Sequence, residues 1–314
     1  MKNQRVLVTG GAGFIGSNLA GELALENEVV IIDDLSTGRM GNITDLLKTG
    51  NVRFVRGSIT DIELLRGSFK DIDYVFHQAA LASVPGSIDD PVASNNVNIN
   101  GTLNVLIAAR DNNVKKVIIA SSCAVYGDPE VMPVAETAQL NPKSPYAVTK
   151  LACEYYCNVF SEVYDLPAVS LRYFNVYGPH QNPGSEYAAV VPKFINRVIS
   201  ARPPVIYGDG LQTRDFVFVK DVVRANILAA ESKESGVFNV GSGVSITVAE
   251  LAGTITGLLG KDMKPLHEAQ REGEIRNSVA DISKAKAIGY EAGYSLEEGL
   301  GETMGWFKTG ANES

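Results

Sequence analysis

The chain has 314 residues, a formal net charge of -8 at pH 7 and a sequence pI near 5.1. This length is enough to bury one large hydrophobic core or two modest ones. An acidic protein repels phosphate polymers and anionic lipids, so the charge argues against non-specific binding to nucleic acid or to a membrane surface. We therefore expect a globular protein of two lobes, in which any phosphate ligand is held by a few local groups.

The N-terminal segment has a basic residue before apolar ones, yet it is not typical of a signal peptide. Glycines interrupt residues 1–16, no small-residue cleavage site follows, and no run reaches the roughly 18 apolar residues of a membrane span. Three cysteines without CxxC spacing and three histidines indicate neither a disulfide framework nor a zinc site. We expect a cytoplasmic protein without a metal ion.

Short apolar, β-branched runs recur through the first half of the chain. They predict strands at residues 6–8, 29–32, 53–55, 74–76, 117–120 and 169–171. Helical periodicity follows at residues 14–25, 98–111 and 146–163. This alternation is typical of an α/β fold with a doubly wound parallel sheet, the Rossmann fold, which we assign to residues 1–175.

After residue 175 the alternation weakens into loops rich in proline and glycine. Helices are predicted at residues 191–199, 221–230, 248–259 and 282–288. These patterns predict a smaller C-terminal α/β lobe for the substrate, residues 176–314, and the segment 214–230 belongs either to this lobe or to the first. We expect the ligand in a cleft between the lobes.

A glycine loop follows the first predicted strand. Gly10, Gly13 and Gly16 open the helix that begins at Phe14, and Asp33 ends the second predicted strand. Glycines also serve tight turns that bind nothing. Here the strand before them, the helix after them and the later carboxylate together favour a dinucleotide site, with the pyrophosphate at the helix N-terminus and the ribose on Asp33. An acid at this position favours NAD over NADP.

A second motif joins Ser122, at the end of the fifth predicted strand, to Tyr146 and Lys150 on the helix that follows Pro145. A tyrosine and a lysine four positions apart share one helix face. A positive charge at about 4 Å is worth about 4 kcal/mol at an effective dielectric of about 20, so Lys150 and an oxidised nicotinamide could lower the phenol pKa by roughly three units. We predict that Tyr146 is the base in a hydride-transfer reaction and that Ser122 binds the same substrate oxygen.

With these motifs the chain resembles the extended short-chain dehydrogenase/reductase superfamily. Four signatures occur in the family's order: TGGAGFIG at residues 9–16, NINGT at 98–102, SSxxVYG at 121–127 and YxxxK at 146–150. Segments 77–85, 144–150, 172–178 and 271–276 are similar to those of nucleotide-sugar 4-epimerases, particularly UDP-N-acetylglucosamine 4-epimerases. The resemblance covers nearly the whole chain.

The resemblance implies roles for individual residues. The implied catalytic residues are Ser122, Tyr146 and Lys150. The implied NAD contacts are Gly10, Gly13, Phe14, Ile15, Gly16, Asp33, Ile59, Ala79, Asn98, Ser121, Tyr146 and Lys150. The implied UDP-sugar contacts are Ala82, Ser122, Cys123, Tyr146, Asn175, Ala189, Val191, Tyr207, Arg214, Arg271, Glu274 and Ser278. The two arginines suit a diphosphate and Tyr207 offers an aromatic face to uracil.

The resemblance also bears on the sugar. Ser278 stands where glucose-specific relatives carry a bulky tyrosine, which favours N-acetylhexosamines with the plain hexoses also accepted. Ser58 replaces an aspartate that reaches adenine in many relatives, and Asp61 is a candidate to remake that contact. Cys123 and Ala124 replace serines, and neither can serve as the general acid of a sugar 4,6-dehydratase.

The expected activity is an isomerase reaction, the NAD-dependent inversion of C4 in a UDP-hexose through a transient 4-keto sugar. The alternatives left open are a glucose-specific 4-epimerase, a UDP-hexuronate 4-epimerase or decarboxylase, and a non-catalytic NAD-sensing protein. The resemblance implies a homodimer through two helices of each subunit, here residues 98–111 and 146–163. The biosynthetic pathway stays open.

Overall fold

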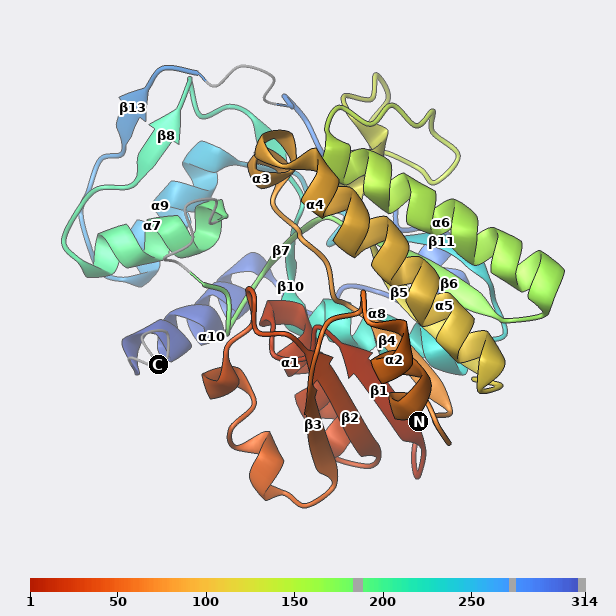
Figure 1. The fold of residues 1–314 in the computed structure, drawn as a ribbon. Coiled ribbons are helices and arrows are strands. Elements are labelled where there is room, and N and C mark those ends of the chain that lie inside the picture. Colours follow the sequence, from red (N-terminus) through yellow and green to blue (C-terminus); the bar gives the residue numbers. More distant parts are fainter. Residues whose placement is uncertain (183–188, 271–274, 310–314) are drawn as a thin grey trace.

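The computed structural model describes residues 1–182, 189–270 and 275–309. Within them, a seven-stranded parallel sheet has the order β11-β6-β5-β4-β1-β2-β3 (Figure 1). Its strands are β1 (Arg5–Thr9), β2 (Glu28–Asp33), β3 (Val52–Arg56), β4 (Tyr74–His77), β5 (Lys116–Ser122), β6 (Ala168–Tyr173) and β11 (Gly236–Val240). Each of the six predicted strands lies within one of these, so the doubly wound fold is confirmed.

Helices cover both faces of this sheet because its strands are apolar on both sides. Along β1, Val6 and Val8 pack into one hydrophobic core and Leu7 packs into the other. The first core lies under α1 (Phe14–Ala24) and α8 (Val219–Glu231). The second lies under α2 (Ile62–Ser68), α5 (Gly101–Asp111) and α6 (Pro145–Tyr164).

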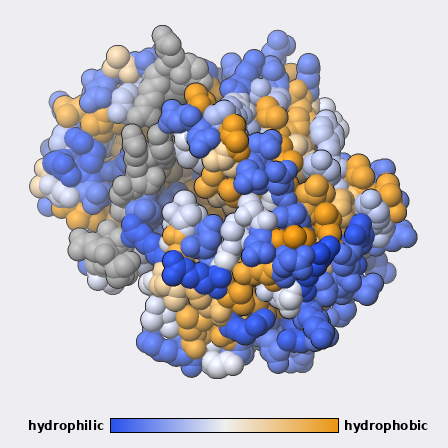
Figure 2. Space-filling view, viewed as in Figure 1, coloured by the Kyte–Doolittle hydropathy of each residue, from blue (hydrophilic) through white to orange (hydrophobic). Residues whose placement is uncertain are grey.

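Three short helical segments lead from β4 to α5. They are α3 (Val84–Asp89), α4 (Pro91–Asn95) and a π-helical turn (Asn96–Asn100). Both α3 and α4 pack against α6. Figure 2 shows hydrophobic residues at the surface on this side of the molecule, where α4 and α6 lie.

The smaller lobe has a hydrophobic core of its own. Its helices are α7 (Val190–Ile199), α9 (Val248–Leu258) and α10 (Leu296–Lys308). Its strands form three pairs: β8 (Val205–Tyr207) with β13 (Leu266–Glu268), β7 (Asn175–Tyr177) with β10 (Phe216–Phe218), and β9 (Thr213–Arg214) with β12 (Ile246–Thr247). Residues 282–288, predicted as an α-helix, form a shorter 3-10 helix, Lys284–Ile288, which ends at Gly289 in a left-handed conformation.

The chain crosses between the two lobes more than once. Helix α8, in the segment that the sequence assigns to either lobe, packs against α1 and β5, and β11 pairs with β6. The division at residue 175 stays a prediction. In the ranges described, no helix combines the length and apolar character that a bilayer crossing requires.

Candidate active site

The strand order reverses beside β1, because the chain runs outward from β1 to β3 and then returns to β4 on the other side. Ligands of open α/β sheets bind outside the carboxyl ends of the strands at such a point. Gly10 lies there with φ +67°, and a Cβ on it would stand 2.7 Å from the backbone nitrogen of Ala79. A Cβ on Gly16 would overlap the Gly10 carbonyl oxygen. These glycines let backbone pass close to backbone at the switch point.

Helix α1 begins directly after this loop. Gly13 is its N-cap residue, and no side chain caps the first turn. The first N–H groups of a helix have no intrahelical partner and favour an anion. The end of α1 therefore fits a pyrophosphate, as the sequence predicts.

Asp33 ends β2 beside the same loop and is 7% exposed. Its carboxylate accepts the backbone N–H of Ala12 at 2.9 Å and that of Leu35 at 2.8 Å. Burial raises the pKa of this carboxyl, and the two backbone hydrogen bonds oppose the shift. A carboxylate has about four acceptor sites, so Asp33 keeps capacity for a ribose diol. The loop, the helix end and the carboxylate together fit NAD.

Other predicted cofactor residues have side chains that bind the protein itself. Asn98 is 1% exposed, donates to the Leu81 carbonyl at 3.1 Å and Thr149 Oγ1 at 3.0 Å, and accepts the Leu81 N–H at 2.8 Å. Ile59 is in the hydrophobic core, and the Ser121 hydroxyl donates to Glu154. Their contacts with a cofactor stay predictions.

Two residues concern the adenine contact. Ser58 accepts hydrogen bonds from Thr60, through the backbone N–H at 3.3 Å and the hydroxyl at 2.9 Å. Asp61, proposed to remake that contact, is the N-cap of α2, where Oδ1 accepts the N–H groups of Glu63 and Leu64 at 3.1 Å each. The structure therefore gives Asp61 a capping role.

The structure brings the predicted catalytic residues together at the end of β5. Helix α6 begins with Ser144 as N-cap and Pro145 in its first turn, and this places Tyr146 next to the sheet edge. The Tyr146 phenol lies close enough to the Ser122 hydroxyl for that group to lower its pKa. Lys150 Nζ lies 5.8 Å from the Tyr146 ring centroid and donates to the Ala120 carbonyl at 2.8 Å.

Burial dominates the electrostatics of this group. It raises the pKa of Tyr146 to about 12, while the nearby Ser122 hydroxyl lowers it. Burial lowers the pKa of Lys150. In the protein without its cofactor, burial thus sets the Tyr146 pKa, and the Lys150 ammonium is bonded to a backbone carbonyl. The predicted lowering of the phenol pKa by Lys150 and an oxidised nicotinamide stays a prediction.

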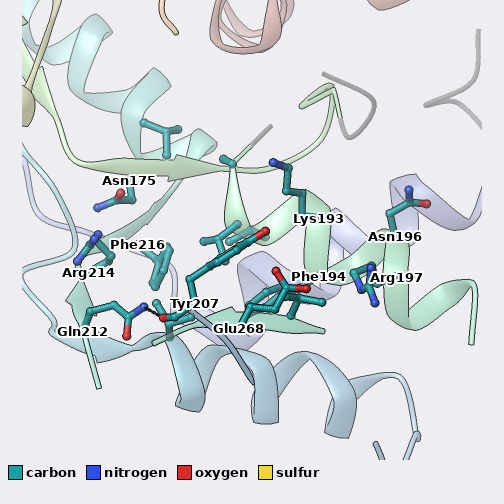
Figure 3. Close-up of a pocket in the computed structure, with 16 residues that line it drawn as sticks. Asn175, Lys193, Phe194, Asn196, Arg197, Tyr207, Gln212, Arg214, Phe216 and Glu268 are labelled. Atoms are coloured by element: carbon teal, nitrogen blue, oxygen red, sulfur yellow. Dashed lines mark hydrogen bonds between the residues drawn. The ribbon is translucent and has the colours of Figure 1, made fainter. Parts of the chain in front are cut away.

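A cavity of about 670 Å³ lies in the smaller lobe, and Figure 3 shows the residues that line it. Its walls come from α7, β7, β8, β10 and the segment around β9. Five predicted substrate residues line it: Asn175, Ala189, Val191, Tyr207 and Arg214. Lining residues that the sequence interpretation missed include Lys193, Phe194, Arg197, Gln212, Phe216 and Glu268. The basic pair at positions 193 and 197 of α7, four residues apart, was a detectable signal.

Strand pairing connects the cavity to the catalytic group. Ser122 is in register with Tyr173 of β6, and Asn175 begins β7 two residues later. On the other side, Ser278 lies close enough to Cys123 to lower the pKa of its thiol. Burial raises the pKa of the Cys123 thiol to about 11. The structure therefore places Ser278 beside the residue that follows Ser122.

Asp215, which the sequence did not single out, holds this arrangement. It is fully buried and accepts the N–H groups of Ser242 at 2.6 Å, Gly243 at 3.0 Å and Ala280 at 3.0 Å. It thus ties Arg214 to the segment that carries Ser278. Ala82 is exposed before α3. Two predicted substrate residues, Arg271 and Glu274, lie outside the described residues.

Comparisons with known proteins agree with this geometry. The chain is 46% identical to a UDP-N-acetylglucosamine 4-epimerase from Methanobrevibacter ruminantium M1, solved with UDP-N-acetylmuramic acid, with a TM-score of 0.96 over 99% of this chain and 100% of that one. It is 39% identical to UDP-glucose 4-epimerase from Thermotoga maritima, solved with UDP-glucose, with a TM-score of 0.93 over 98% and 99% of the chains. It is 40% identical over 310 residues to UDP-glucose 4-epimerase from Mycolicibacterium smegmatis, covering 97% of this chain and 98% of that protein. A family model matches residues 6–241, and the chain belongs to the NAD dependent epimerase/dehydratase family.

Proposed function

We propose that this protein interconverts the C4 epimers of a UDP-hexose and prefers UDP-N-acetylhexosamines to the plain hexoses. The broader class follows from the family and its relatives: the protein is an isomerase, an NAD-dependent UDP-sugar 4-epimerase. The observation that carries the proposal is the proximity of Ser122 and Tyr146 at the carboxyl end of β5, together with a cavity of nucleotide size whose Asn175 follows the strand paired with β5.

The residues divide the reaction between a base, an orienting group and a clamp. Tyr146 takes the proton of the sugar 4-hydroxyl and later returns it, while Ser122 holds that oxygen in place. Residues of the glycine loop, the start of α1 and Asp33 would hold NAD, which would supply the acceptor and later the donor of the C4 hydride, so that no net oxidation results. Lys150 keeps a positive charge near the phenol, which favours the phenolate once a substrate occupies the site.

Inversion requires that the 4-keto sugar present both faces in turn. The cavity can hold the nucleotide while the sugar turns, because Arg214 suits the diphosphate and Tyr207 suits the uracil ring. Binding energy from these remote groups anchors the nucleotide and leaves the sugar free to turn about its bond to the diphosphate.

The preference for N-acetylhexosamines rests on Ser278. Its small side chain lies beside Cys123, next to Ser122, so an acetamido group would meet little bulk there. A tyrosine at this position would project into the same space. A glucose-specific 4-epimerase, a UDP-hexuronate 4-epimerase or decarboxylase, and an NAD-sensing protein are the alternatives.

Proton NMR of UDP-N-acetylglucosamine and UDP-glucose, each incubated with the purified protein, tests the proposal. We expect both galacto anomeric signals to appear, with the higher kcat/KM for the N-acetyl sugar. In S278Y we expect conversion of the N-acetyl sugar to fall by about tenfold or more while glucose conversion persists, since excluding a group from a pocket costs a few kcal/mol. If wild type converts UDP-glucose alone, the proposed preference is wrong and the proposed 4-epimerase reaction stands. Conversion of neither sugar would direct the test to UDP-hexuronates.

We further propose that the protein is a homodimer through α6 and its neighbours. Val148, Tyr155, Val159 and Val163 on α6 are 50%, 58%, 47% and 64% exposed, and Val92 on α4 is 76% exposed. The spacing of the four α6 residues places them along one side of the helix, and exposed apolar residues that gather on one face mark an interaction surface. Light scattering at micromolar concentration should give twice the chain mass for wild type, and the monomer mass for V159E/V163E.

A further inference from the structure

Helix α6 faces the end of β5 with three polar side chains, spaced four residues apart. Residues at this spacing share one helix face. They contact three consecutive residues of the strand: Tyr146 with Ser122, Lys150 with the Ala120 carbonyl at 2.8 Å, and Glu154 with the Ser121 hydroxyl at 2.5 Å. The proposed function uses the first two side chains and gives no role to Glu154.

Glu154 is held by Arg172 of β6 in a buried, two-pronged ion pair. The Arg172 Nε donates to Oε1 of Glu154 at 2.9 Å, and Nη2 donates to Oε2 at 2.6 Å. Both side chains are 3% exposed. Paired donors of this kind fix orientation as well as charge. Removal of one partner leaves the other charge buried without compensation.

The Glu154 and Arg172 ion pair forms hydrogen bonds with residues on both sides of Ser122. Before it, Ser121 donates to Glu154. After Ser122, the 3-10 turn Cys123–Tyr126 ends at Tyr126, whose phenol oxygen accepts the Arg172 Nη1–H at 2.9 Å. This phenol in turn donates to Asn239 Oδ1 of β11 at 2.6 Å. Neither Glu154 nor Arg172 is among the residues that line the cavity.

We propose that the Glu154 and Arg172 ion pair is a positioning device that sets the separation of Ser122 and Tyr146. The Tyr146 hydroxyl is delivered by α6 and the Ser122 hydroxyl by β5, so their separation depends on how the helix lies along the strand. Glu154 fixes that relation two helical turns beyond Tyr146, and Arg172 fixes Glu154. The inference rests on the proposed function for its kinetic consequences and on the geometry for its structural ones.

The test compares E154Q with a matched buried control on the same strand. E154Q keeps the size of the side chain and an acceptor for Ser121 but leaves Arg172 without a counter-charge. K116M is the control, because Lys116 lies at the other end of β5, is 5% exposed, and donates to the carbonyls of Ala229 and Glu234 at 2.7 Å each. Both variants lose a buried charged group, and only E154Q disturbs the end of the strand that carries Ser122.

With UDP-sugar as substrate we expect kcat to fall about 10- to 100-fold in E154Q, since misplacement by about 1 Å can cost that much. KM should stay within about twofold, and the deuterium isotope effect for a C4-deuterated substrate should rise because the chemical step becomes slower. K116M should lower the melting temperature with kcat and isotope effect unchanged per folded molecule. If E154Q behaves like K116M, the pair is only structural and the inference is overturned.

Two further measurements keep the inference falsifiable. S121A removes a single hydrogen bond to Glu154, and we expect a smaller decrease in kcat, about 3- to 10-fold, with a correspondingly smaller rise in the isotope effect. Crystal structures test the inference without measuring activity. The Tyr146 and Ser122 hydroxyls should be about 1 Å or more farther apart in E154Q than in wild type and K116M. An unchanged separation overturns the inference. Inactive wild type would refute the proposed function alone.

Discussion

Replacement of Tyr146 by phenylalanine separates the chemistry of the site from its structure. The substitution removes one hydroxyl, which lies beside Ser122, and leaves the ring in place. Even a full hydrogen bond is worth only about 0.5–1.5 kcal/mol of folding free energy. A general base contributes about 10²- to 10⁴-fold to a rate, or roughly 3–5 kcal/mol of activation free energy. We therefore expect a small loss of stability and a large loss of turnover.

The assay is the initial rate of epimer formation in Y146F, with bound NAD and the melting temperature measured in parallel. Y164F is the matched control, because Tyr164 ends the same helix, is 45% exposed and is not part of the proposed dimer patch. The pH profile adds a second test. Burial raises the Tyr146 pKa to about 12 in the protein alone, so the phenolate fraction, and kcat/KM with it, should rise about tenfold per pH unit at low pH. Y146F should lose this slope. A Y146F rate within threefold of wild type would refute the assignment of the base.

Three other outcomes follow from the geometry. A Cβ on Gly16 would overlap a carbonyl oxygen of the glycine loop, while a Cβ on Gly21 of the same helix would stand 3.7 Å from its nearest neighbour. Titration calorimetry should therefore show that G16A loses NAD binding and that G21A retains it. R214M should raise KM for the UDP-sugar about 10- to 100-fold with kcat little changed, because a charged contact to the diphosphate is worth about 1.5–3 kcal/mol. A lower kcat at unchanged KM would contradict the role of Arg214 in binding the diphosphate. Burial raises the pKa of Tyr126 and Tyr146 to about 12 each, so the folded state holds these protons more tightly than the unfolded state does. This stabilisation is fully present below pH 10 and is lost as the pH rises toward 12, by roughly 3 kcal/mol for each residue. Urea unfolding should therefore give a lower free energy of unfolding at pH 11 than at pH 9. Equal free energies at the two pH values would contradict this reasoning.

Local patterns were sufficient for most of the sheet and for the residues around the catalytic edge. The six predicted strands are short apolar runs, and five of them are largely buried, the exception being the edge strand β3. The seventh, β11 (Gly236–Val240), is as long as β1 and β3 but begins with a glycine, contains Asn239 and follows a polar loop. Its apolar residues do not reveal that it pairs with β6, because that pairing is made by the fold.

Helix α10 was missed because glycines lower its helix propensity. Gly299 is nevertheless required, since a Cβ there would overlap the Tyr177 hydroxyl. A capping box between Ser295 and Glu298 was the available signal for this helix. The pKa of Tyr146 could not be predicted from its spacing to Lys150, because the spacing reports a neighbouring charge and says nothing about burial.

The most direct test of the proposed reaction follows a C4-deuterated UDP-N-acetylglucosamine by NMR and mass spectrometry, with the purified protein in ordinary water. The account predicts the galacto epimer with deuterium retained at C4, because the hydride that leaves this carbon returns to it while Tyr146 handles only the hydroxyl proton. Epimer formed with deuterium lost to solvent would contradict the account, since it would place proton abstraction at carbon in the mechanism.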